Sequence, residues 1–132
     1  MPNMANIVVK DLDGSTDVTF EKLVPSAGDK SPAIWRLPAA SGIPSAAVTL
    51  SVTSKASVNR KVRIVEGVVI CPIIETDPHG AVKVVDRDTF TFSGQVKVDY
   101  AQPLHDRNVA LATGLIRSDL IREILRVGYS AT

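Results

Sequence analysis

The stretch that decides the fold runs from Val48 to Ile70 and reads VTLSVTSKASVNRKVRIVEGVVI. In its first part every second residue is apolar and the residues between them carry hydroxyls. Because side chains alternate between the two faces of a strand, this pattern predicts a β-strand with one apolar and one polar face. The apolar set is Val48, Leu50 and Val52, and the polar set is Thr49, Ser51 and Thr53.

A second strand follows after a mostly polar connection over residues 54–59. Residues 60–70 are rich in β-branched side chains, which favour strands. Two strands joined by a short polar loop predict a hairpin with one apolar and one polar face. In the second strand, one parity holds Arg60, Val62 and Ile64, and the other holds Lys61, Arg63 and Val65.

Toward the N-terminus the sequence predicts another hairpin, with strands over residues 7–9 and 18–20 and a turn at Asp13-Gly14-Ser15. Residues 25–46 are rich in Pro, Ser, Ala and Gly. Residues 34–37 are a candidate short strand within them. Because prolines donate no ladder hydrogen bond, Pro32, Pro38 and Pro44 limit this strand and favour a place at a sheet edge.

After Ile70 the pattern predicts a loop over residues 71–81, which contain Pro72, Pro78 and Gly80. Residues 82–100 predict either one long strand or a pair of strands. Their alternation assigns Phe90, Phe92, Val96 and Val98 to an apolar face and Thr89, Thr91, Ser93, Gln95 and Lys97 to a polar one. A sheet face made of such side chains either faces water or binds a ligand.

After Pro103 the spacing of the apolar residues changes from that of a strand to that of a helix, which predicts two helices. The first carries Val109, Ala112, Leu115 and Ile116 on one face. Ser118-Asp119 predicts the N-cap of a second short helix, which ends at Gly128 and whose apolar side chains are Leu120, Ile121, Ile124 and Leu125. Helices this short need a surface to pack on. We therefore predict a single α+β domain over residues 1–132.

Charge is distributed unevenly along a chain of 132 residues whose net charge is only +1. No Asp or Glu occurs between Lys30 and Val65. This favours a local basic surface for a polyanion such as nucleic acid, and a solvated hairpin tip fits equally well. The basic residues of the stretch are Lys30, Arg36, Lys55, Arg60, Lys61 and Arg63.

Catalytic and metal-binding patterns are missing from the sequence. His79 and His105 belong to no metal-ligand cluster, and no phosphate-binding or nucleophile motif occurs. We predict neither enzymatic activity, nor a cofactor, nor a metal. No apolar run approaches the roughly 18 residues of a membrane span, and no signal peptide is recognisable. The single cysteine, Cys71, is interpreted as a small hydrophobic residue, with an intermolecular disulfide as the alternative.

The motif Val48-Thr49-Leu50-Ser51-Val52, followed after six residues by Asn59-Arg60-Lys61, resembles the coat proteins of small single-stranded RNA bacteriophages, the leviviruses. The run from Gly14 to Thr19 is similar to the first hairpin of that family, and two C-terminal helices also agree with it. The resemblance covers essentially the whole chain.

The resemblance implies an N-terminal β-hairpin, a five-stranded antiparallel sheet and two C-terminal α-helices. It implies an intertwined homodimer, which then builds a T=3 icosahedral shell around genomic RNA. It further implies that the protein is a virion component assembled in the bacterial cytoplasm. In several members of the family the inner sheet face also binds one RNA hairpin and represses replicase translation. Single-stranded RNA and further copies of the chain are thus the expected partners, with no membrane partner.

The resemblance also implies the RNA-binding residues. Thr49 and Ser51 match positions that line an adenine pocket in the family, and Asn59 and Lys61 match positions that contact bases and phosphates. Arg63 and Val65 depart from the family's Thr and Lys, which makes Arg63 a candidate phosphate contact. The complete predicted set is Thr49, Ser51, Thr53, Lys55, Asn59, Lys61, Arg63, Thr89 and Thr91.

Two further roles stay open on the residues alone. One is a soluble RNA-binding regulatory α+β dimer that forms no shell. The other is a small enzyme whose site has no recognisable motif. Particle formation separates the first of these from a capsid protein, and a pocket with converging titratable groups would be needed for the second.

Overall fold

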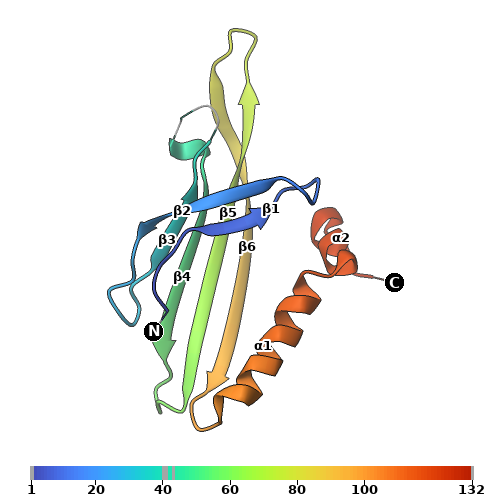
Figure 1. Cartoon of the computed structure of the whole chain (residues 1–132). Coiled ribbons are helices and arrows are strands. Elements are labelled where there is room, and N and C mark those ends of the chain that lie inside the picture. The colour runs from blue at the N-terminus through green and yellow to red at the C-terminus, as the bar shows by residue number, and fades with distance from the viewer. Residues whose placement is uncertain (1, 40–41, 43, 132) are drawn as a thin grey trace. The chain divides into compact units, whose positions relative to one another are not determined.

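The computed structural model describes residues 2–39, 42 and 44–131, and within them the chain forms one antiparallel sheet followed by two helices (Figure 1). The six strands of this described part lie in sequential order, from β1 to β6. The chain divides into two compact units, Met1–Gln95 and Val96–Thr132. The strands are β1 (Ile7–Lys10), β2 (Asp17–Val24), β3 (Ala33–Leu37), β4 (Val48–Ala56), β5 (Val62–Thr76) and β6 (Val82–Lys97).

The expected N-terminal hairpin is confirmed. In it β1 and β2 pair antiparallel, with Val9 opposite Val18. The carboxylate of Asp13 organises the turn, because it accepts hydrogen bonds from the backbone N–H groups of Ser15 and Thr16, each at 2.9 Å, and from the Thr16 hydroxyl. These bonds favour the ionised form and lower the pKa of Asp13 to about 2.

The predicted edge position of the third strand is wrong. Strand β3 lies between β2 and β4, with Trp35 opposite both Lys22 and Leu50. The physical reason is that Pro32 and Pro38 stand immediately outside the strand. They bound its length and remove no N–H group from either ladder.

Strands β4 and β5 form the longest paired ladder whose register is established, from Thr49 opposite Ile70 to Ala56 opposite Arg63. The hairpin closes at Ser57, whose N–H donates to the carbonyl of Val62 at 2.8 Å. Arg60, within the turn, has a left-handed backbone with φ of 59°.

The predicted loop over residues 71–81 is also wrong, because β5 continues to Thr76. Pro72 is tolerated there since the ladder with β4 ends at Ile70, so no partner on that side needs its missing N–H. The actual turn spans residues 77–81. Within it the Asp77 carboxylate accepts hydrogen bonds from the N–H groups of His79 and Ala81, at 2.9 and 2.8 Å.

Residues 82–97 form one continuous strand, β6, which settles the alternative left by the sequence. In the described part of the chain, strands β2–β6 form a five-stranded sheet, and β2 also pairs with β1 in the N-terminal hairpin, as the resemblance implied. The α+β class and the order of hairpin, sheet and helices are confirmed.

The second unit contains helices α1 (Gln102–Ile116) and α2 (Asp119–Val127). Ser118 occupies the N-cap position of α2 as predicted, but its hydroxyl donates to the carbonyl of Leu115 at 2.7 Å instead of capping the helix. Gly128 ends α2 with φ of 81°. Neither helix buries a side chain in the single chain. Among the described residues, no helix combines the length and apolar character needed to cross a membrane.

A short 3-10 helix, η1 (Pro44–Ala46), precedes β4 and holds part of the small buried centre of the first unit. Ala46 and Ala47 are buried, at 8% and 3% exposure. Most other apolar side chains of the described chain are half-buried or exposed. A single copy thus leaves much of its apolar surface uncovered.

Candidate nucleic-acid interface

The strand registers assign each side chain of the sheet to one of two faces, because residues directly opposite each other in an antiparallel pair share a face. We call the face that carries Thr49 the hydroxyl face. Opposite Thr49 lie Arg36 on β3 and Ile70 on β5. The hydroxyl face comprises Ile34 and Arg36 of β3, Thr49, Ser51, Thr53 and Lys55 of β4, and Ile64, Glu66, Val68 and Ile70 of β5.

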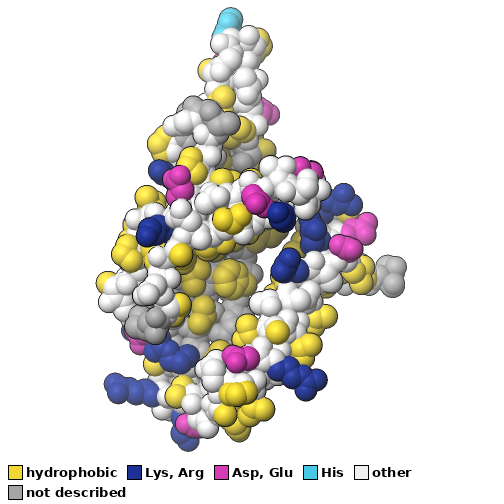
Figure 2. All heavy atoms as spheres, viewed as in Figure 1, with side chains coloured by type: hydrophobic (Ala, Val, Ile, Leu, Met, Phe, Trp, Pro, Cys, Tyr) yellow, Lys and Arg dark blue, Asp and Glu magenta, His cyan; other side chains and the backbone are white. Residues whose placement is uncertain are grey.

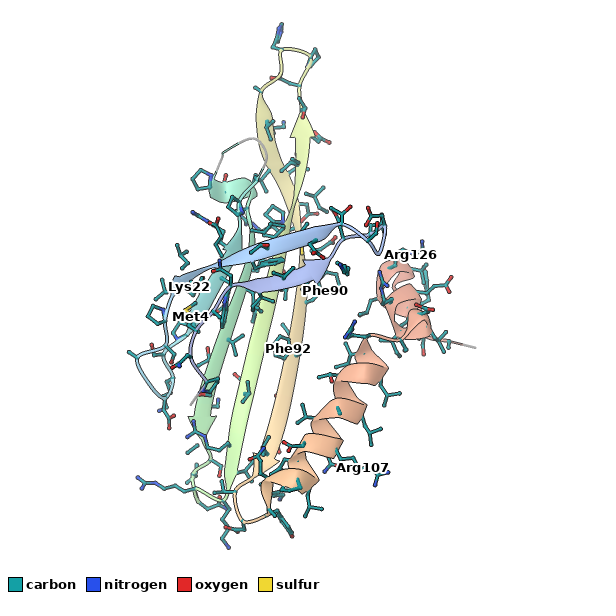
Figure 3. The ribbon with its side chains drawn as sticks, in the orientation of Figure 1. Met4, Lys22, Phe90, Phe92, Arg107 and Arg126 are labelled. Atoms are coloured by element: carbon teal, nitrogen blue, oxygen red, sulfur yellow. The ribbon has the colours of Figure 1, made fainter. Side chains whose placement is uncertain are left out.

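The other face, which we call the apolar face, carries Val48, Leu50 and Val52 of β4. Gly67 lies opposite Val52, and the ring of Phe92 on β6 covers it (Figure 3). Figure 2 shows hydrophobic side chains gathered over the middle of the sheet. The N-terminal segment reaches this side, since the Trp35 indole N–H donates to the carbonyl of Ala5 at 2.8 Å. The predicted separation of apolar and hydroxyl side chains on β4 is therefore confirmed.

The predicted RNA-binding residues do not all lie on one face. Thr49, Ser51, Thr53 and Lys55 lie on the hydroxyl face, whereas Arg63 is opposite Ala56 and lies on the apolar face. The cause is the register of the β4–β5 hairpin. A turn over residues 58–61 places Ser57 against Val62, and a shift of one residue would reverse the face of every β5 side chain.

Arg63 forms an intramolecular ion pair at the protein surface. Its guanidinium donates two hydrogen bonds to the carboxylate of Asp29, at 2.8 and 3.1 Å, and a longer one of 3.4 Å to the Ser54 hydroxyl. This bidentate ion pair lowers the pKa of Asp29 and raises that of Arg63. It fastens the loop between β2 and β3 to the β4–β5 hairpin, where Lys30 N–H also donates to the carbonyl of Ser54 at 2.9 Å.

Asn59 and Lys61 lie in the exposed turn beyond both strands. The side-chain oxygen of Asn59 accepts hydrogen bonds from the Ser57 hydroxyl at 2.8 Å and from the Lys61 N–H at 3.1 Å. Asn59 thereby orders the turn, and Lys61 is exposed at the end of that turn, directly before β5. The structure does not bring either residue together with Thr49 and Ser51.

On the neighbouring strand β5, Ile70 lies opposite Thr49 and Val68 lies opposite Ser51. The hydroxyls of β4 consequently stand beside a stripe of half-buried aliphatic side chains. Such a surface offers hydrogen bonds to base edges and apolar contact to base faces without an aromatic platform.

Lys55 is paired on the hydroxyl face, where its Nζ lies 3.6 Å from Oε1 of Glu66. Both side chains are about half exposed, so this pair contributes little to stability. It does place one carboxylate among the cations of this face.

Strand β6 carries its cations on one face and its acids on the other. Gly67 of β5 fixes the apolar side of β6, because the ring of Phe92 covers it. Alternation then places Thr89 and Thr91 on the hydroxyl face, with Lys83 and Arg87, and Asp86 on the apolar face with Asp88. The signal was present in the sequence as cations at odd positions and acids at even positions.

Cys71 lies within β5 and is half-buried. Burial and the nearby charge of Asp88 raise the pKa of its thiol, which disfavours the reactive thiolate. Among the described residues, no group of three or more His, Cys, Asp or Glu side chains is arranged to hold a metal ion.

Comparison with known proteins rests on structure alone, because no family model and no curated protein matches the sequence. The chain is similar to the virus-like particle of Beihai levi-like virus 21, with a TM-score of 0.80 and 21% identity over 99% of each chain. It is also similar to the virus-like particle of bacteriophage NT-214, with a TM-score of 0.81 and 17% identity, over 99% of this chain and 100% of that one.

A third similar structure is the capsid protein of bacteriophage GA, with a TM-score of 0.73, 15% identity and 95% coverage of each chain. These likenesses extend over nearly the full length. The chain therefore has the fold of the levivirus coat proteins, as the sequence resemblance implied.

Proposed function

We propose that the protein is a capsid subunit that dimerises, assembles into an icosahedral shell and packages single-stranded RNA. The observation that carries the proposal is the likeness, over nearly the whole chain, to subunits of virus-like particles. The T=3 geometry, assembly in the bacterial cytoplasm and repression of translation through an RNA hairpin belong to the same proposal. They rest on the resemblance alone.

Uncovered surface supports dimerisation. Strand β6 is the terminal strand of the described sheet, and such a long open edge invites pairing with another chain. The helices expose large apolar side chains in the single chain, among them Leu115 and Leu120 at 67% and 58%. Pairing of two β6 edges, with helices of each copy on the other, would cover both surfaces.

The hydroxyl face supports RNA binding. It joins the hydroxyls of β4 and β6 to cations on three strands, namely Arg36, Lys55 and the Lys83–Arg87 pair of β6. Phosphates provide sequence-independent attraction to the cations, and hydroxyls beside aliphatic side chains suit contacts with bases. We retain Thr49, Ser51, Thr53, Lys55, Thr89 and Thr91 as RNA-facing residues and withdraw Asn59, Lys61 and Arg63 from that face.

Expression of the chain alone in bacteria tests the assembly step. We expect uniform spherical particles by negative-stain electron microscopy, which co-elute with nucleic acid in size-exclusion chromatography. The ratio of absorbance at the nucleic-acid and protein maxima should be high and should fall to a protein-like value after nuclease treatment of disassembled particles. A stable dimer that binds RNA but never forms particles would reject the capsid role and favour the soluble regulatory dimer.

A further inference from the structure

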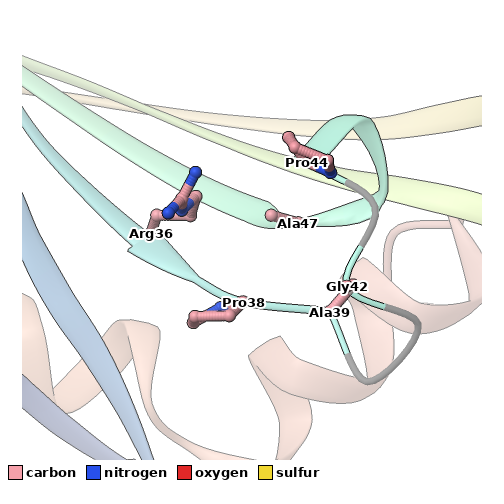
Figure 4. A pocket seen from close by; sticks show the side chains of 6 residues that line it. All are labelled: Arg36, Pro38, Ala39, Gly42, Pro44 and Ala47. Atoms are coloured by element: carbon pink, nitrogen blue, oxygen red, sulfur yellow. The ribbon is translucent and has the colours of Figure 1, made fainter.

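A small hollow at the end of the β3–β4 ladder lies beside the hydroxyl face (Figure 4). Arg36 and Pro38 come from β3 and its continuation, and Ala47 directly precedes β4. Ladder pairing of Arg36 with Thr49 places this part of the hollow on the Thr49 side of the sheet. The lining residues are Arg36, Pro38, Ala39, Gly42, Pro44 and Ala47.

Arg36 supplies the only formal charge among these lining residues. Within the described part of the chain, no carboxylate lies within ion-pair distance of its guanidinium. Glu21 of β2 stands opposite Arg36 in the ladder and is exposed, so it is the nearest acid by register. Arg63, by contrast, has both terminal guanidinium nitrogens bonded to the carboxylate of Asp29.

The dimensions and chemistry of the hollow select its ligand. Its volume is about 80 Å³. A phosphate group suits that space better than a whole base does. Arginine binds phosphate through a planar fork of N–H donors, and the two prolines give the rim an apolar surface for the adjoining sugar.

We propose that Arg36 and this hollow form a phosphate subsite for single-stranded RNA, at the η1 end of the hydroxyl face. The inference rests on the proposed RNA-binding function and extends it to a residue outside the predicted set. An RNA strand that follows the hydroxyls of β4 reaches Arg36 directly beside Thr49. The subsite fixes the position of the strand at this end, and the base contacts lie along β4.

The test is the salt dependence of binding for a labelled oligouridylate, with full-length protein kept below the concentration at which particles scatter light. Loss of one phosphate contact should reduce the log–log slope by about 0.7 for a single strand. We expect Arg36→Gln to show this reduction. Lys61→Gln, which removes the same charge from a residue off the face, should leave the slope unchanged. Circular dichroism and thermal unfolding establish that each variant is folded.

A second variant, Pro38→Asp, leaves Arg36 in place and puts a carboxylate at the exposed rim of the hollow. It should weaken oligouridylate binding at least as much as Arg36→Gln does. If the wild-type slope is steep and both variants keep it, the phosphate subsite is wrong while the RNA-binding face stands. If the wild-type protein shows no salt-dependent binding, the RNA-binding part of the proposed function fails, and the subsite with it.

Discussion

The phenyl ring of Phe92 on β6 lies directly over Gly67 on β5, so close that a Cβ atom on residue 67 would overlap three of its ring carbons. Gly67 stands opposite Val52 in the middle of the β4–β5 ladder. Glycine weakens a strand unless a neighbour approaches its backbone. Here the neighbour is an aromatic ring, which fills the apolar face at the point where a side chain is missing.

This contact predicts the effect of Gly67→Ala. Because the added methyl group pushes aside the outer end of a half-exposed ring, we expect a loss of about 1 kcal/mol in the free energy of unfolding, the low end for overpacking. Urea unfolding would measure it. The double variant Gly67→Ala/Phe92→Leu should recover part of the loss, since the smaller side chain makes room. Additive losses in the double variant would show that the two residues do not interact as described.

The Asp29–Arg63 ion pair predicts a pH dependence of stability. The folded pKa of Asp29 lies below its ordinary value of 3.8, so the pair stabilises the protein above that pH and the contribution is lost as the pH falls through the folded pKa. In Arg63→Met, Asp29 lacks its partner, and stability should fall less steeply on acidification. Urea midpoints at several pH values between neutrality and pH 3 would compare the two proteins.

Asp29→Asn serves as the matched variant, because it removes the titrating carboxylate and leaves Arg63 present. It should show the same flattened profile as Arg63→Met. Both variants should bind RNA like the wild-type protein, since the pair lies on the apolar face. A selective loss of RNA affinity in Arg63→Met would return Arg63 to the RNA-binding set.

The turn at Asn59 allows a sharp distinction between a structural and an RNA-binding role. Asn59→Asp retains the oxygen that accepts from Ser57 and Lys61, whereas Asn59→Ala removes it. We expect Asn59→Ala to cost about 1 kcal/mol of stability and Asn59→Asp to cost little. Filter binding should give unchanged RNA affinity for Asn59→Asp. A marked loss of affinity would mean that the added negative charge meets RNA at this turn.

Ser51 and Ser54 offer a matched pair on one strand, because they lie on opposite faces of β4. Ser51→Ala removes a hydroxyl from the hydroxyl face, and we expect RNA binding to weaken by about 0.5–1.5 kcal/mol if that hydroxyl bonds RNA. Ser54→Ala removes a hydroxyl that contacts Arg63 and should leave RNA binding unchanged. Equal effects in the two variants would argue against a one-sided interface.

The sequence was informative wherever local chemistry decides the structure. The β1–β2 turn, the alternation along β4, and the helix end at Gly128 were predicted correctly, because each depends on residues within a few positions. The position of β3 in the sheet and the length of β5 were predicted incorrectly. Prolines indicate which N–H groups are missing, but they do not show whether a partner strand extends that far.

The candidate site illustrates the same limit. A single strand reveals which residues share its faces, and this assigned Thr49 and Ser51 to one face correctly. The relation between two strands depends on the turn that joins them, and the β4–β5 turn sets the opposite parity for Arg63. The resemblance to the family matched residue types position by position, and it contained no information on the register between β4 and β5. The partnership of Arg63 with Asp29, far away in the sequence, left no local signal.

The charge separation on β6 yields the most direct test of the hydroxyl face. Lys83→Gln/Arg87→Gln removes two cations from that face, and Asp86→Asn/Asp88→Asn removes two acids from the other face of the same strand. If RNA lies along the hydroxyl face, the first double variant should reduce the log–log salt slope by about 1.4, at about 0.7 for each phosphate contact. The second should change the slope little, because its residues point away from the RNA. Filter binding across a salt series measures both slopes, and the absorbance ratio of purified particles reports the RNA that each variant packages.

Should binding instead follow net charge, the acid-to-amide variant would bind RNA more tightly than the wild-type protein by about as much as the cation variant binds it less tightly. That symmetric result would show a diffuse electrostatic attraction and remove the hydroxyl face from the proposal.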